Sequence, residues 1–194
     1  MKLLETVLAG AVCGLLALPA SAALIATGTM TDTQVSPGEY QYNLTLHNTG
    51  TTTIGTFWFS WVPGLNFMSA TPTSITSPTG WTENVTTGPG SAIQWLAGST
   101  LLAAGSSLTG FSFQSTETPA QLAGFAAPPY QTFPMTTSFV YSGAPFSDSG
   151  YQFVVPVPSA VPLPGALGLL VGGLGLTGLV GWRSRSRRSE LLAM

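Results

Sequence analysis

The fold of this chain is decided by one short stretch of sequence, Tyr40-Gln41-Tyr42-Asn43-Leu44-Thr45-Leu46-His47. Large apolar side chains stand at every second position, and polar side chains fill the positions between them. A period of two is typical of a β-strand that has one face in a core and the other in water. The middle of the chain shows no sustained apolar period of 3.6 residues, so the sequence predicts an all-β domain.

The same alternation recurs further along the chain, and we expect the large side chains of each run to share one face. The runs are Phe57, Phe59 and Trp61; Thr109, Phe111 and Phe113; Met135, Thr137, Phe139 and Tyr141; and Tyr151, Phe153 and Val155. Turns rich in proline and glycine separate the runs. These turns are Ser36-Pro37-Gly38, Asn48-Thr49-Gly50, Val62-Pro63-Gly64, Pro78-Thr79-Gly80 and Gly88-Pro89-Gly90. Short strands with regular turns predict an antiparallel β-sandwich, immunoglobulin-like or jelly-roll, over residues 23–153.

The expected core of this domain is largely aromatic. Its members are Leu44, Leu46, Phe57, Phe59, Trp61, Phe111, Phe113, Phe139 and Phe153. Burial of these side chains is the expected source of stability, at about 25 cal/mol for each Å² of apolar area removed from water. Residues 122–133 contain two adjacent prolines and little alternation, so we expect them to form a long loop that crosses the sandwich.

Residues 1–22 have the features of a secretory signal peptide. Lys2 precedes an apolar run over residues 7–18, which is too short to span a bilayer. The residues after this run are Pro19-Ala20-Ser21-Ala22-Ala23. This order predicts export through the Sec translocon and cleavage by signal peptidase between Ala22 and Ala23.

Cys13 is the one cysteine of the chain, and it lies inside the predicted signal peptide. A lipid-anchored alternative would use Cys13, but the residues before it lack the leucine and the small residue usually found there. Once the peptide is removed, we expect the chain to have neither a disulfide nor a thiol nucleophile.

Residues 165–182 form an uncharged, apolar run that predicts a single transmembrane helix. As a helix this run would be about 27 Å long, close to the hydrocarbon thickness of a bilayer. A basic cluster follows immediately, formed by Arg183, Arg185, Arg187 and Arg188. Four arginines stop translocation, so we expect residues 183–194 to stay in the cytoplasm and the body to be exported. Before the helix, residues 154–164 are rich in proline and predict an extended spacer.

The spacer ends in Val161-Pro162-Leu163-Pro164-Gly165-Ala166, and a glycine- and leucine-rich helix and an arginine cluster follow it. This order of three parts resembles the PEP-CTERM class of bacterial sorting signals, and most closely its VPLPA variant. The resemblance covers residues 158–188, and Gly165 stands where that variant usually has alanine. It implies handling by an exosortase, a membrane-embedded cysteine protease or transpeptidase of Gram-negative bacteria thought to cut near the proline motif.

Proteins with this signal are exported and are often linked to exopolysaccharide and biofilm production. The resemblance therefore implies a single-pass inner-membrane precursor that is delivered to the cell surface or the extracellular matrix. The alternative is a plain anchored protein that is not cleaved.

The distribution of charge excludes several classes of function. No lysine or arginine occurs from residue 3 through residue 182. Within this segment, the body that follows the predicted signal peptide carries one histidine and five carboxylates, namely Asp32, Glu39, Glu83, Glu117 and Asp148. A nucleic-acid-binding surface needs Lys or Arg on phosphates, and Schiff-base chemistry needs a lysine, so we expect neither.

Enzyme chemistry has few candidates in this sequence. His47 is the sole candidate for a general base, and its strand position predicts a solvent-facing side chain. The five acids are scattered singly, without the spacing of a calcium loop, although a calcium site built from them stays open. Glu39 and Glu83 could meet across strands as a glycosidase pair, but we expect both to be solvated surface carboxylates. We expect no catalytic residue, no metal and no cofactor.

Sugar binding is the alternative to a structural or adhesive role. β-Sandwich modules stack pyranose rings on exposed tryptophans, and Trp58 and Trp81 are the best candidates for such stacking. Trp95 and Tyr130 are weaker candidates, and burial against a second sheet is the competing interpretation for all of them. The sequence thus predicts a non-enzymatic exported protein associated with exopolysaccharide or biofilm, with a carbohydrate-binding module as the alternative.

Overall fold

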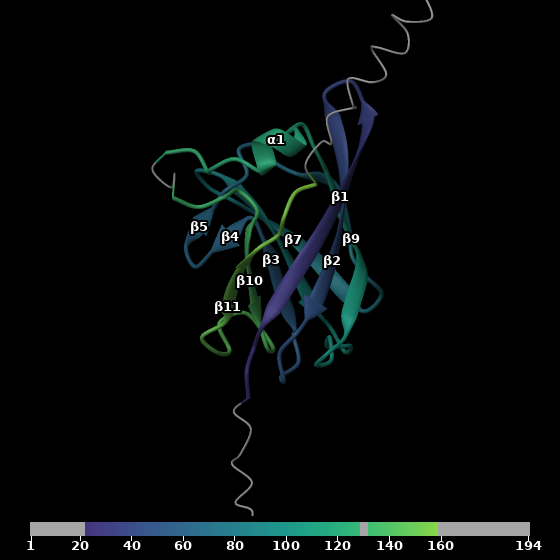
Figure 1. The fold of residues 1–194 in the computed structure, drawn as a ribbon, viewed down its shortest axis with the longest axis vertical. Helices are drawn as coiled ribbons and strands as arrows, with labels where there is room; N and C mark the ends of the chain where they lie inside the picture. The colour runs from purple at the N-terminus through teal and green to yellow at the C-terminus, as the bar shows by residue number, and fades with distance from the viewer. Residues whose placement is uncertain (1–21, 129–131, 159–194) are drawn as a thin grey trace, which may run out of the picture.

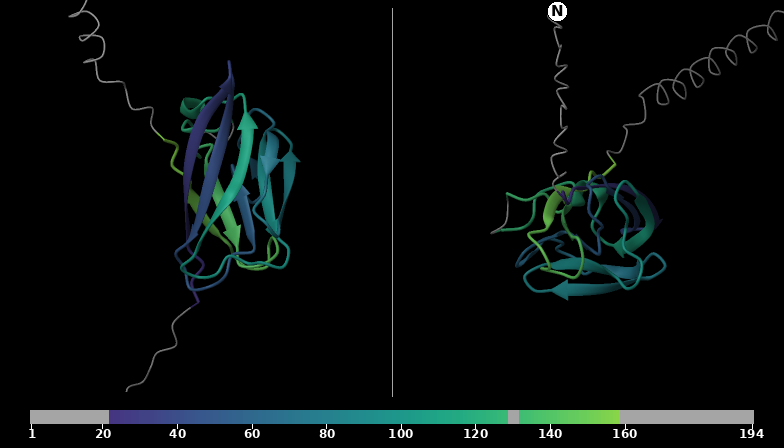
Figure 2. Two further views of the ribbon diagram at one scale, coloured as in Figure 1. Left: turned by 90° about the vertical axis from the view of Figure 1, so that its right-hand side faces the viewer. Right: turned by 90° about the horizontal axis from the view of Figure 1, so that it is seen from below.

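The structure is a computed structural model, and it describes residues 22–128 and 132–158 of the chain. Two antiparallel sheets lie face to face as separate layers (Figures 1 and 2), which confirms the expected all-β, sandwich-like architecture. Within these residues no helix combines the length and the apolar character needed to cross a membrane. The predicted membrane helix, residues 165–182, lies outside the described residues.

The first sheet has the strand order β1-β2-β9-β6, and the second has the order β11-β10-β3-β8-β7. The four strands of the first sheet are β1 (Ala26–Ser36), β2 (Glu39–Asn48), β6 (Thr73–Thr76) and β9 (Ser107–Ser115). The five strands of the second sheet are β3 (Thr56–Phe59), β7 (Trp81–Thr87), β8 (Ser91–Ala97), β10 (Thr137–Tyr141) and β11 (Tyr151–Val154). A small hairpin of β4 (Trp61–Val62) and β5 (Leu65–Asn66) continues from β3.

Strand β2 is central to the first sheet and follows the alternation of its sequence. Tyr42, Leu44 and Leu46 are buried, whereas Asn43 is exposed. The expected turn at Ser36-Pro37-Gly38 joins β2 to β1, which is the longest strand and which the sequence analysis did not identify. Its small and polar residues, Ala-Thr-Gly-Thr-Met-Thr, hide the alternation because the buried positions are filled by alanine, glycine and methionine.

Strand β9 contains a bulge that overturns one expectation about faces. Leu44 pairs with Phe111 and the next residue of β2, Thr45, pairs with Thr109, so Gly110 is the extra residue. Gly110 has φ +97°, a conformation that glycine adopts without steric cost. The bulge shifts the alternation by one residue, and Thr109 is therefore exposed on the face opposite to Phe111.

A second irregularity, at Ser60, overturns the expectation that Trp61 shares a face with Phe57 and Phe59. Ser60 has φ +61°, which breaks the strand between β3 and β4. Phe57 and Phe59 lie in the main core between the sheets, whereas Trp61 stacks on Trp58 with ring centroids 4.2 Å apart. Phe139 also belongs to this second cluster, while its neighbour Val140 enters the main core.

All nine expected core residues are buried. Seven of them lie in the main core, which Phe111 of β9 links to the second sheet. Its ring contacts Phe57, Trp81 and Trp95 at centroid distances of 5.4, 5.4 and 5.2 Å. These edge-to-face contacts join strands of both layers and hold the sandwich together.

Residues after β9 make the predicted long connection, with one addition. A single helical turn, α1 (Pro119–Leu122), precedes it, and Thr118 and Gln121 form a capping box at its start. Leu122 is buried in the main core. Residues 123–128 and 132–136 contain no helix or strand beyond a bridge between Phe125 and Pro134.

Candidate functional site

The second sheet carries a separate cluster of large side chains on the face that points away from the main core. Its members, which we call the outer aromatic cluster, are Trp58, Trp61, Ala92, Phe139 and Tyr141. The Trp58 and Trp61 rings are stacked at 18°, and Phe139 meets Trp61 edge-on at 5.8 Å. Each member is less than 10% exposed. The cluster is therefore a second apolar unit outside the space between the sheets.

The loop between β10 and β11, residues 142–150, places Phe146 against this cluster. The Phe146 ring lies 5.9 Å from that of Trp61 and 5.4 Å from that of Tyr141, yet Phe146 is 65% exposed. Its backbone has φ +63°, which a side chain other than glycine adopts at a cost. Phe146 is thus a partly exposed ring on a strained loop position.

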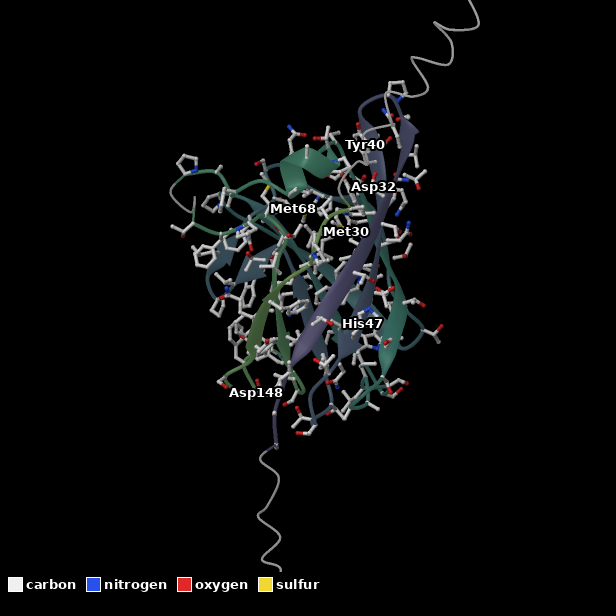
Figure 3. The ribbon with its side chains drawn as sticks, viewed as in Figure 1. Met30, Asp32, Tyr40, His47, Met68 and Asp148 are labelled. Atoms are coloured by element: carbon white, nitrogen blue, oxygen red, sulfur yellow. The ribbon has the colours of Figure 1, made fainter. Side chains whose placement is uncertain are left out.

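Asp148 fixes this loop through hydrogen bonds within it. The Ser142 N–H, the Ser142 hydroxyl and the Gly150 N–H all donate to the Asp148 carboxylate. Burial acts to raise the pKa of Asp148, but these hydrogen bonds outweigh it and hold the pKa below its usual value. Figure 3 shows Asp148 at the end of the molecule where β1 begins.

Unsatisfied polar atoms and strained backbone coincide at the outer aromatic cluster. Among the described residues, three buried side-chain polar atoms have no hydrogen-bond partner: Trp58 Nε1, Ser60 Oγ and Glu117 Oε2. Trp58 is a member of the outer aromatic cluster, and Ser60 directly precedes Trp61, another member. Three non-glycine residues of the described chain have positive φ, and two of them, Ser60 and Phe146, adjoin the cluster. Such features concentrate at functional sites because evolution otherwise removes them.

Trp58 and Trp81, the candidates for sugar stacking, are both buried, as the competing interpretation of the sequence has it. Trp58 is 6% exposed because Trp61 covers it, and Trp81 is 5% exposed because it packs edge-on against Phe111 in the main core. Trp95 is fully buried, and its Nε1–H donates to the Thr76 carbonyl at 3.0 Å. Tyr130 lies outside the described residues.

Amide side chains flank the cluster in a single row across the second sheet. The strand registers place Asn84 opposite Gln94, Gln94 opposite Trp58, Trp58 opposite Phe139, and Phe139 opposite Gln152. Residues directly opposed in an antiparallel sheet point to the same face. This amide row therefore runs Asn84, Gln94, Trp58, Phe139, Gln152, with amides at its two ends and aromatic rings beside Gln94.

The face that carries the amide row has no ionisable carboxylate or basic group on its strands. Glu83 of β7 pairs with Trp95, which is buried in the main core, so Glu83 belongs to the opposite face. Its carboxylate accepts a hydrogen bond from the Ser77 hydroxyl. Glu39 lies on β2 of the other sheet and accepts from Ser36 at 3.1 Å. Glu39 and Glu83 therefore belong to different sheets, and the alternative of a carboxylate pair across neighbouring strands is wrong.

Glu117 is the one buried carboxylate of the described residues, at 5% exposure. Its Oε1 atom accepts from the backbone N–H groups of Ser69 and Ala70 at 2.6 and 3.2 Å, and Oε2 has no partner. Its backbone carbonyl accepts from the Tyr42 hydroxyl at 2.5 Å. Burial raises the pKa of Glu117, and the two backbone N–H groups offset part of that effect. No pattern near Glu117 in the sequence signals this burial.

His47 points away from the core on the outer face of the first sheet, as expected (Figure 3). Its Nδ1 atom hydrogen-bonds with the Ser107 hydroxyl at 2.7 Å, and its Nε2 atom lies 3.5 Å from the Thr29 hydroxyl. A serine, a histidine and a carboxylate must converge for triad chemistry, and the partners of this imidazole are hydroxyls alone. Among residues 22–128 and 132–158, no three His, Cys, Asp or Glu side chains are grouped as metal ligands.

Two cavities lie away from the amide row. One of about 120 Å³ is bordered by residues 66–69 and 89–90, and by residues 126–128 of the long connection. The other, of about 290 Å³, is bordered by Ala22, Leu24, Thr52, Ser142 and residues 148–150, at the end of the molecule where the described chain begins. Neither includes His47.

Of the predicted processing positions, the structure describes two. Ala23 donates its backbone N–H to the Thr51 hydroxyl at 2.8 Å, and its carbonyl accepts from the Thr51 N–H at 2.8 Å. Ala22 is exposed. Ala20, the sorting motif Val161–Gly165 and the arginines of residues 183–188 lie outside the described residues.

The chain matches no known protein family and no curated protein.

Proposed function

We propose that this chain is an exported, non-enzymatic surface or extracellular-matrix protein that an exosortase sorts and cleaves, in association with exopolysaccharide or biofilm. One observation carries the proposal: the described sandwich occupies the interval between the two predicted address segments. Ala23, the first residue after the predicted signal peptide, is also hydrogen-bonded to Thr51 through both its N–H and its carbonyl. Cleavage after Ala22 would leave the sandwich intact.

The direction of the chain also supports display at a surface. The described chain begins at one end of the long axis and ends near the other (Figure 1). The predicted spacer and membrane helix continue from the second end. Asp148 lies at the first of these ends, opposite the end from which the predicted spacer continues (Figure 3).

The finer fold type is also our proposal. An immunoglobulin-like or jelly-roll connection is supported by the way the chain passes repeatedly between the sheets: β2 to β3, β6 to β7, β8 to β9 and β9 to β10 each change layer. Such crossovers characterise Greek-key sandwiches.

The test is the intact mass of the protein recovered from its native cells and medium. We expect loss of residues 1–22 together with a new carboxyl end near residues 162–165. A matched pair of variants sharpens the result: P162A/P164A should block the second cut, whereas P156A/P158A, in the same spacer, should not. A native mass that ends at Met194 would show an ordinary single-pass protein and would overturn sorting by an exosortase.

A carbohydrate-binding module is the second candidate function. The amide row beside the outer aromatic cluster favours it, because aromatic faces combined with neutral hydrogen-bonding side chains suit sugar rings.

A further inference from the structure

We propose that the outer face of the second sheet binds a neutral glycan, with one pyranose ring taking the place of Phe146 against Trp61 and Tyr141. The inference rests on the second candidate function and names its site and ligand class. It differs from simple stacking on exposed tryptophans, because the tryptophans of this site are buried.

The position of Phe146 allows a ligand to replace its ring against Trp61 and Tyr141. It sits on a loop rather than on a strand, so its departure breaks no ladder hydrogen bond. Its ring is 65% exposed, and its backbone at φ +63° is strained where it stands. The hydrogen bonds from Ser142 and Gly150 to Asp148 hold the two ends of the loop and leave residues 143–147 between them. Within that segment the Gly143 carbonyl accepts from the Thr56 hydroxyl at 2.6 Å, and the Ser147 N–H donates to the Ala144 carbonyl at 3.1 Å. The Phe146 ring is therefore displaced by rotation of its side chain, while the loop backbone stays in place.

Polar atoms at the same place lack the partners that a sugar provides. Trp58 Nε1–H needs an acceptor, and the buried Ser60 hydroxyl has no partner at all. The side chains of Gln94 and Gln152, beside the rings in the amide row, make no hydrogen bond within the described residues. Sugar hydroxyls both donate and accept, so a glycan chain along the amide row can serve the exposed amides of Asn84 and Gln152 and the half-buried amide of Gln94.

Charge selects the kind of glycan. The strands present no carboxylate or basic side chain on this face, because Glu83 of β7 lies on the opposite one, so no strand residue here would pair with a uronate or a sulfate. The remaining acids of the exported body give it a net negative charge that repels polyanions. A neutral glycan encounters no such barrier.

The dimensions fit an extended chain. Neighbouring strands are about 4.8 Å apart, so the five positions of the amide row span about 19 Å. This is the length of several linked pyranose rings. A purely apolar partner would leave Asn84, Gln94 and Gln152 facing it without hydrogen bonds, which is costly.

The experiment uses the protein purified from its native cells in affinity electrophoresis. The probes are the neutral and acidic fractions of the exopolysaccharide made by those cells, separated by anion exchange. We expect the neutral fraction to retard the protein and the acidic fraction to leave its mobility unchanged. The Q94A variant should weaken retardation about three- to tenfold, the range expected for one lost hydrogen bond.

Phe146→Gly tests the replaceable ring, because glycine accepts the observed φ and opens the cluster. It should bind the neutral fraction several-fold more tightly than the wild type. Phe125→Ala is the matched control: Phe125 is 64% exposed and lies in the long connection, and its removal should change nothing. Thermal midpoints measured on each variant check that it is folded.

Equal affinity of wild type and F146G, or absence of retardation by the neutral fraction in both, would overturn the inference. Retardation by the acidic fraction alone would overturn the assignment of a neutral ligand. The intact mass is independent of this site, so failure here leaves the proposed sorting standing, and failure of sorting leaves glycan binding standing.

Discussion

Glu117 illustrates how one residue can make stability depend on pH. A carboxylate buried with one unpaired oxygen is more stable when protonated, because water no longer solvates the charge. Its pKa in the folded protein is therefore above the unfolded value. The native state binds the proton more tightly, so the contribution of Glu117 to the free energy of unfolding falls as pH rises from the unfolded pKa through the folded one.

Glu117→Gln should remove this dependence. The amide oxygen can still accept from the N–H groups of Ser69 and Ala70, but it no longer titrates. As the pH rises from 4 to 7, the free energy of unfolding of E117Q should increase relative to that of the wild type. Denaturant titrations at each pH measure this difference. Glu83→Gln, at an exposed carboxylate, is the control. Parallel pH profiles for wild type and E117Q would contradict the prediction.

Ser60 is a second residue whose effect on the free energy of unfolding can be tested. Its φ of +61° is unfavourable for a side chain, and its hydroxyl is buried without a partner. Ser60→Gly should raise the free energy of unfolding by about 0.5–1 kcal/mol, since relief of the left-handed conformation exceeds the entropy gained by the unfolded chain. Ser60→Ala removes the hydroxyl but keeps the strain. A loss of stability in S60G would show that Ser60 has a favourable interaction in the folded state.

At the scale of elements, one carboxylate orders the loop that carries Phe146. The hydrogen bonds to Asp148 hold its pKa below the usual value. Their stabilising contribution is therefore present above the unfolded pKa and is lost as the pH falls through the folded one. The loop should stay closed at neutral pH and loosen in strong acid.

Asp148→Asn should loosen the same loop at neutral pH. The amide is a weaker acceptor than the carboxylate, so the backbone N–H groups of Ser142 and Gly150 should exchange faster with solvent. Hydrogen exchange followed by mass spectrometry measures this rate, and Asp32→Asn on β1 is the control. Unchanged exchange in D148N would mean that contacts of Phe146, rather than the carboxylate, order the loop.

At the scale of the whole molecule, the two sheets depend on Phe111. Its ring on β9 contacts β3, β7 and β8 of the opposite sheet. Phe111→Ala should lower the free energy of unfolding by about 3–5 kcal/mol through lost burial and the cavity left behind. Phe125→Ala should cost less than about 0.5 kcal/mol because that ring is exposed. Equal losses in denaturant titrations would contradict the central role given to Phe111.

The charge distribution makes a further prediction for the whole chain. Trypsin cuts after Lys and Arg, and none occurs from residue 3 through residue 182. The exported body should therefore survive trypsin even in denaturant, while chymotrypsin should cut it at its aromatic residues once it is unfolded. Mass spectrometry of the digest checks both, and internal tryptic fragments would contradict the prediction.

The sequence by itself determined the all-β class and the buried residues. Alternation over residues 40–47 and the later runs identified nine side chains that are all buried, because large apolar groups leave water wherever the strands lie. It did not identify β1, whose buried positions hold small residues. The signal peptide, the sorting motif and the membrane helix stay predictions from sequence.

The tertiary structure alone decided which face each side chain takes. Trp61 and Thr109 lie on the faces opposite to those predicted. In each case one residue with positive φ, Ser60 before Trp61 and Gly110 after Thr109, shifts the period of two by one position. Trp58 became buried because Trp61 then stacks on it. Glu117 became buried because distant N–H groups, those of Ser69 and Ala70, meet its carboxylate. Local alternation records the preference for burial, but contacts between distant segments determine where each buried group lies.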